Sequence, residues 1–148
     1  MTKQQYAARY DALAPACYRF ALWTLGEPAA AAQALSAAFR AGYSALGSGD
    51  AFEVGFLTLL WAECARVPPI PPADGIGGGA DPTPEGWLAG LWRDERGLLL
   101  LASLFGCDAQ TLAAITGQPP LRVWRRCRLL TERSGAPMPA FDRSGSRG

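Results

Sequence analysis

The chain has 148 residues, a net charge of only +1, and hydrophobic residues at 49% of its positions. This length fits one domain or two small ones, and the hydrophobic content is enough for a packed core, which excludes wholesale disorder. There is no histidine, no useful pair of carboxylates and no nucleophile motif, so we expect a protein that is not an enzyme. A nucleic-acid role would require a local basic patch, because the chain as a whole is nearly neutral.

The cysteines are too widely spaced for a metal site of the CxxC kind; they are Cys17, Cys64, Cys107 and Cys127. Each has apolar neighbours, so we expect buried thiols, no bound metal and no cofactor. The N-terminal stretch lacks the apolar region of a signal peptide, and no apolar run reaches the length of a transmembrane helix. We therefore expect a reduced, cytoplasmic protein without membrane insertion.

The first part of the chain has apolar residues at spacings of three and four, which predicts helices over residues 4–25, 29–45 and 51–66. Pro15 is expected to separate an entry turn from the rest of the first helix. Asp50 is the predicted N-cap of the third helix. The apolar sides of the second and third helices should carry Leu35, Ala38, Phe39, Tyr43, Phe52, Phe56, Leu59, Leu60 and Cys64.

Composition then changes abruptly at residues 67–86, VPPIPPADGIGGGADPTPEG, which are rich in proline and glycine and predict an interdomain linker. Residues 87–105 predict one or two helices with Trp87, Leu91, Leu98, Leu101, Leu104 and Phe105 as core. Residues 135–148 are typical of a flexible tail. No strand pattern appears, so we expect an all-α protein with two small helical domains, 1–66 and 87–134.

The stretch 105–130, FGCDAQTLAAITGQPPLRVWRRCRLL, predicts a helix-turn-helix. Asp108 is a suitable N-cap for a short first helix, and Gly117 suits its C-terminal end. Pro119 and Pro120 suit the opening of the second helix. This helix should bury Val123, Cys127 and Leu130 and carry its arginines elsewhere, at Arg122, Arg125, Arg126 and Arg128.

Positive charge is concentrated in this C-terminal part. Residues 87–134 hold seven arginines against four acidic residues, a net of +3, whereas residues 1–66 are neutral overall. The second helix of a helix-turn-helix enters the DNA major groove, so Arg122, Arg125, Arg126 and Arg128 are the candidate DNA-binding residues. The alternative is that two packed helices with an arginine-bearing outer face form a solvated surface that does not bind DNA.

The layout resembles the extracytoplasmic-function sigma factors of bacterial RNA polymerase. The resemblance to that family's region 2 lies in Tyr18-Arg19-Phe20-Ala21-Leu22, Leu25-Gly26, residues 31–43, Phe52, Phe56-Leu57 and Leu60. The resemblance to region 4 lies in Leu91, Glu95-Arg96, Leu98-Leu99-Leu100, Gly106, Leu112-Ala113, Gly117, Val123 and Arg126. It implies a transcription regulator that binds promoter DNA and RNA polymerase core, with an anti-sigma factor as a further partner.

The chain departs from this family in its N-terminal half. The family's helix corresponding to residues 29–45 carries acidic residues that bind a basic coiled coil of the polymerase, and here residues 32–37 have none. The basic stretch that opens promoter DNA is also missing, since Pro68-Pro69 follow almost directly after Arg66.

These departures leave a second hypothesis, a sigma-like interaction module that binds an anti-sigma factor or another partner without recognising a promoter. Its candidate partner-binding residues are Gln33, Ser36, Phe39, Arg40 and Trp124. Trp124 has two alternatives at this point: exposure at a protein interface, or packing back onto its own domain.

Overall fold

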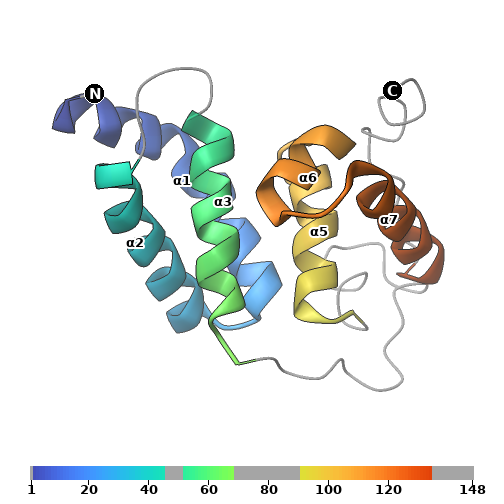
Figure 1. Cartoon of the computed structure of the whole chain (residues 1–148). Coiled ribbons are helices and arrows are strands. Elements are labelled where there is room, and N and C mark those ends of the chain that lie inside the picture. Colours follow the sequence, from blue (N-terminus) through green and yellow to red (C-terminus); the bar gives the residue numbers. More distant parts are fainter. Residues whose placement is uncertain (1, 46–51, 69–90, 135–148) are drawn as a thin grey trace. The chain divides into compact units, whose positions relative to one another are not determined.

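Helices account for all regular structure in the residues that the computed structural model describes, 2–45, 52–68 and 91–134 (Figure 1). The expected all-α fold is confirmed over these ranges. In chain order the helices are α1 (Lys3–Leu25), α2 (Pro28–Ala45), α3 (Phe52–Ala65), α5 (Arg93–Leu104), α6 (Ala109–Thr116) and α7 (Pro120–Ser134). None of them is both long enough and apolar enough to span a bilayer. The predictions for Asp50, linker residues 69–86, Trp87 and the tail 135–148 lie outside the described residues.

The chain divides into two compact units, an N-terminal unit of residues 1–67 and a C-terminal unit of residues 68–148. The first holds α1, α2 and α3, and the second holds α5, α6 and α7. Within each unit every helix packs against the other two.

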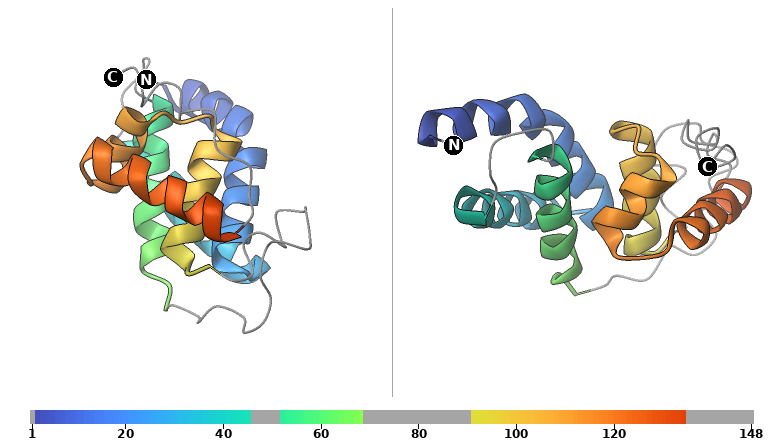
Figure 2. Two further views of the ribbon diagram at one scale, coloured as in Figure 1. Left: turned by 90° about the vertical axis from the view of Figure 1, so that its right-hand side faces the viewer. Right: turned by 45° about the horizontal axis from the view of Figure 1, so that its top comes forward.

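The first helix, α1, covers the predicted range to within one residue but is less interrupted than expected. Thr2 caps its start by accepting a hydrogen bond from the Gln5 N–H at 3.1 Å, and Gly26 ends it with a left-handed φ of 79°. The helix continues through Pro15, so the predicted separation there is wrong. Proline removes one N–H donor, but Pro15 and Asp11 are both exposed, so water can hydrogen-bond to the Asp11 carbonyl. The helix axis bends along its length (Figure 2).

Aromatic rings join the three helices of the N-terminal unit. The Tyr6 hydroxyl donates a hydrogen bond to the Phe39 carbonyl at 2.6 Å, which fixes α1 against α2. The Tyr6 ring also meets the Phe52 ring edge-on at 5.7 Å, which adds α3. Burial raises the pKa of Tyr6, with a smaller contribution from Tyr10. Most of the predicted core residues are buried, but Tyr43, near the C-terminal end of α2, is 50% exposed; its ring meets the Tyr6 ring in a T-shaped contact at 5.6 Å.

The core of the C-terminal unit is aliphatic. The start of α5 is fixed by two backbone contacts: the Trp92 N–H donates to Glu95 Oε1, and Arg96 Nε donates to the Leu91 carbonyl, both at 2.9 Å. Burial, helped by the nearby charge of Arg93, lowers the pKa of Arg96. The buried side chains come from all three helices and the segments before them, and include Leu91, Leu98, Leu99, Leu100, Leu101, Leu112, Ile115, Val123, Cys127 and Leu130.

Candidate nucleic-acid interface

The turn between α6 and α7 has the geometry that the sequence predicts. Asp108 Oδ1 accepts a hydrogen bond from the Thr111 N–H at 2.8 Å and so caps α6. Gly117 ends α6 with a φ of 75°, and its N–H donates to the Ala113 carbonyl at 2.8 Å. A Cβ at residue 117 would meet no atom within 4 Å, so glycine is needed there for its backbone conformation alone. α7 then begins at Pro120.

One stripe of α7 is fully buried and holds the helix in place. Val123 and Cys127 are 0% exposed and Leu130 is 3% exposed, as their spacing predicts. Burial raises the pKa of the Cys127 thiol to about 12, against a small opposing effect of Arg126. The thiol is therefore protonated at neutral pH and acts as a small apolar side chain. The opposite side of α7 is consequently free to face outward.

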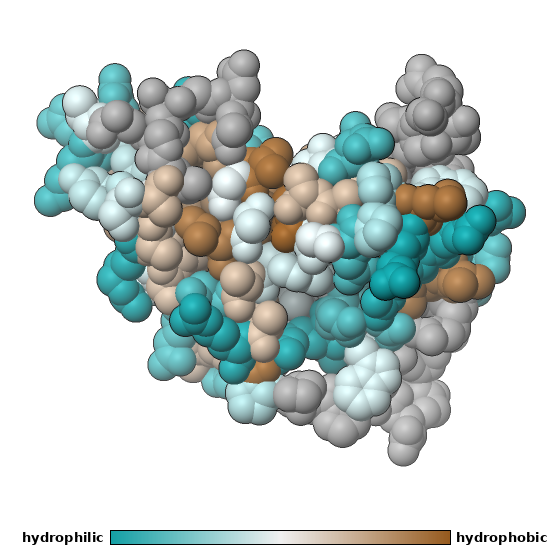
Figure 3. Space-filling model, in the orientation of Figure 1, coloured by the Kyte–Doolittle hydropathy of each residue, from teal (hydrophilic) through white to brown (hydrophobic). Residues whose placement is uncertain are grey.

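We call this opposite side the α7 outer face; its exposed residues are Leu121, Arg122, Arg125, Arg128, Leu129 and Glu132. Figure 3 shows hydrophobic and hydrophilic surface side by side over α7. Leu121 and Leu129 are 58% and 65% exposed. Neither leucine was expected on this face, although the spacing of the buried stripe already places both opposite the core.

The four candidate arginines do not form one equivalent set. Arg126 Nη2 pairs with Asp94 Oδ2 of α5 at 2.9 Å. Arg128 Nε lies 3.6 Å from Glu132 Oε1, one turn further along the helix. The side chains of Arg122 and Arg125 form no ion pair or hydrogen bond with the described residues. The N-terminal half of α7 therefore carries two exposed cations that have no partner among the residues that the structure describes.

Trp124 fully matches neither of the two alternatives, exposure at an interface or packing onto its own domain. Its side chain is partly buried on the flank of α7, and the guanidinium of Arg128 lies over its ring, 5.5 Å from the centroid. The indole N–H is buried, with no hydrogen-bond acceptor among the described residues. Arg128 thus covers the ring, and the ring is not presented as an open aromatic surface.

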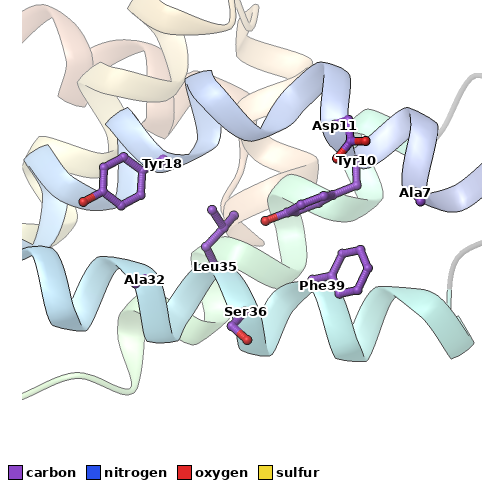
Figure 4. Close-up of a pocket in the computed structure, with 8 residues that line it drawn as sticks. All are labelled: Ala7, Tyr10, Asp11, Tyr18, Ala32, Leu35, Ser36 and Phe39. Atoms are coloured by element: carbon purple, nitrogen blue, oxygen red, sulfur yellow. The ribbon is translucent and has the colours of Figure 1, made fainter.

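The candidate partner-binding residues of α2 are only partly brought together. Ser36 and Phe39 line an open groove of about 350 Å³ between α1 and α2 (Figure 4), which we call the α1–α2 groove. Gln33 and Arg40 are exposed but do not line it, although Arg40 Nη1 donates to Ser36 Oγ at 2.8 Å. The groove lining consists of Ala7, Tyr10, Asp11, Tyr18, Ala32, Leu35, Ser36 and Phe39.

A second cavity, of about 600 Å³, lies beside the Arg126–Asp94 pair in the C-terminal unit and is lined by Glu95, Arg126, Leu129, Leu130 and Glu132. No pattern in the sequence indicates it, because its residues come from two helices that are far apart along the chain. Within the described ranges no group of histidine, cysteine or acidic side chains has the arrangement of a metal site.

Comparison with known proteins adds no relative: no family model, curated protein or solved structure matches the chain.

Proposed function

We propose that this protein is a sigma-factor-like transcription regulator, which binds promoter DNA through α7 and associates with RNA polymerase core. The observation that carries the proposal is the N-terminal half of α7. There Arg122 and Arg125 are exposed and unpaired with the described residues, directly after the glycine turn of a two-helix unit.

The physical argument is one of shape and charge. The DNA major groove admits an α-helix, and in helix-turn-helix proteins the N-terminal residues of the second helix contact the base edges. An arginine can hydrogen-bond to guanine through two donors or bind a phosphate. Within the described ranges, Arg122 and Arg125 have no ion pair to break before they do so. Because Arg128 retains a contact with Glu132, we assign to Arg128 a contact with the phosphate backbone of the DNA and not with a base.

Binding of short duplex DNA by the full chain tests the DNA part of the proposal. With a pool of random duplexes of about 25 base pairs at about 50 mM salt, the unmodified chain should bind, because phosphate contacts need no particular sequence. Arg122→Ala with Arg125→Ala should weaken binding at least about tenfold, since two phosphate contacts and the counterion release that accompanies them are lost.

The matched control is Arg19→Ala with Arg66→Ala, which removes the same charge from exposed positions of the N-terminal unit. This control should bind nearly as well as the unmodified chain. An equal loss in both double variants would mean that net charge alone matters, and no binding at all would refute the DNA part of the proposal.

Association with the polymerase is supported by the sigma-like pattern of the N-terminal unit, in which Tyr18, Phe20, Phe52 and Phe56 lie on packed helices. Purified chain should form a complex with RNA polymerase core in size-exclusion chromatography. A chain that binds DNA but elutes separately from core polymerase would contradict this part.

A second candidate function is protein interaction without promoter recognition, with an anti-sigma factor as the partner. The α1–α2 groove favours it: α2 has no acidic residue, and Arg40 is its only charged side chain. Ser36→Trp should fill the groove and block such a partner, whereas the Arg122 and Arg125 variant should bind the partner normally. The converse result, with only polymerase subunits captured, would argue against this function.

A further inference from the structure

Leu121 is exposed at a position where a helix in the major groove meets the bases. It is the second residue of α7 and is 58% exposed. A helix turns about 100° per residue, so Leu121 and Arg125 lie about 40° apart on the helix surface. Both point away from the buried stripe of Val123, Cys127 and Leu130. Leu121 and Arg125 are therefore the two side chains that project most directly outward from the first turns of α7.

The chemistry of the major groove gives an exposed leucine one specific partner. Thymine alone among the four bases presents a methyl group there, at C5, and apolar side chains read it by contact. Arginine reads guanine through O6 and N7. Resting on the proposed DNA binding, we infer that Leu121 packs against a thymine methyl while Arg125 binds a guanine close to that thymine. The site read by α7 then contains a thymine that is recognised by contact with its methyl group.

The surroundings of Leu121 favour DNA over a protein as its partner. Arg122 follows it directly in the chain, and Arg125 lies about 40° from it on the helix surface. Both are exposed and carry no ion pair among the described residues. A leucine beside two cations that have no ion pair with the described residues suits a polyanion that also has an apolar group at its recognition edge. Thymine-containing duplex DNA supplies both.

Leu129 provides a matched control on the same helix. It is 65% exposed, slightly more than Leu121, but it lies eight residues further on. That separation is about 12 Å along the helix axis, so Leu129 cannot reach the base edges met by the first turns. It lies beside the cavity next to Arg126 instead.

The test uses the full chain and a duplex selected from a random pool by binding to it. Each thymine of that duplex is replaced in turn by deoxyuridine, which removes only the methyl group. Replacement at one position should weaken binding by about fourfold, the factor expected for one buried methyl. Leu121→Ala should bind the thymine and deoxyuridine duplexes equally at that position. Leu129→Ala should keep the fourfold difference.

The possible outcomes separate this inference from the proposed function. Selected duplexes that bind tightly, yet show no deoxyuridine effect at any position, overturn the role of Leu121 and leave DNA binding intact. The role of Leu121 is equally overturned if Leu121→Ala keeps the effect, or if it loses binding to a captured protein while its DNA binding is unchanged. Failure to bind any duplex overturns the proposed DNA binding itself, and this inference with it.

Discussion

The outer faces of α2 and α7 differ sharply although both belong to small three-helix units. α2 exposes alanine, small polar side chains and Tyr43, with Arg40 as its only charged side chain. α7 exposes three arginines, one glutamate and two leucines on its outer face. α2 thus carries a single charged side chain, while α7 concentrates positive charge along its length.

The two helices therefore suit different kinds of contact. A face of alanine and small polar side chains binds a partner through shape and apolar contact. Because such contacts involve few charges, their strength depends weakly on salt. A face of unpaired arginines binds a polyanion and releases counterions, so its contacts depend strongly on salt. Experiments that act on one face and leave the other alone can test whether the two faces make these different contacts.

A change in salt concentration should give the largest difference between binding at α7 and binding at the α1–α2 groove. On duplexes of random sequence, where Arg125 has no fixed guanine and Arg122, Arg125 and Arg128 each neutralise one phosphate, raising salt from about 50 to about 200 mM should weaken DNA binding about 40-fold. A partner bound at the α1–α2 groove should lose less than about twofold over the same range. Fluorescence anisotropy with labelled DNA or labelled partner measures both. The slope should fall by about two units in the Arg122 and Arg125 double variant, and an unchanged slope would break the assignment.

The glycine turn should give an intermediate effect. Gly117→Ala forces a side chain into a φ of 75° and should destabilise the C-terminal unit by about 1–2 kcal/mol, since no steric clash is added. Hydrogen exchange should report faster opening in the C-terminal unit only. Gly26→Ala imposes the same strain at the end of α1 and should loosen the N-terminal unit without changing DNA affinity. Faster exchange of both units in either variant would contradict the separation.

The ion pair between α5 and α7 should give the smallest effect. Asp94→Asn removes the partner of Arg126, whose side chain is 37% exposed, so stability should change by less than about 1 kcal/mol. Loss of the Asp94 carboxylate raises the net charge near the α7 outer face by one and should raise DNA affinity about twofold at low salt. Asp11→Asn makes the same charge change on α1 and should leave DNA affinity unchanged. A fall in affinity for Asp94→Asn would show that the pair positions α7.

Local chemistry explains why the helix-turn-helix geometry could be predicted from the sequence. The cap at Asp108, the left-handed Gly117 and the buried stripe of α7 each depend on residues within a few positions of one another. Spacing and residue type are enough for such features.

Which contacts the arginines of α7 make could not be predicted from the sequence in the same way. Arg126 meets Asp94, which lies 32 residues earlier, and only the packing of α7 on α5 brings the two together. Arg128 covers Trp124 because the two side chains lie one turn apart on the helix surface. The continuity of α1 through Pro15 could not be predicted either, since whether a proline interrupts a helix depends on what else can hydrogen-bond to the released carbonyl.

The cysteines of this chain are distributed evenly between its units. Cys17 and Cys64 belong to the N-terminal unit, Cys107 and Cys127 to the C-terminal unit, and all four are buried and outside any disulfide. Burial raises the pKa of Cys17, with a smaller contribution from Glu53, to about 12, the same value as for Cys127. Because only an accessible thiolate reacts readily, alkylation at neutral pH must wait for a unit to open. The rates at which the four thiols are alkylated therefore measure the opening of each unit separately, within one unlabelled molecule.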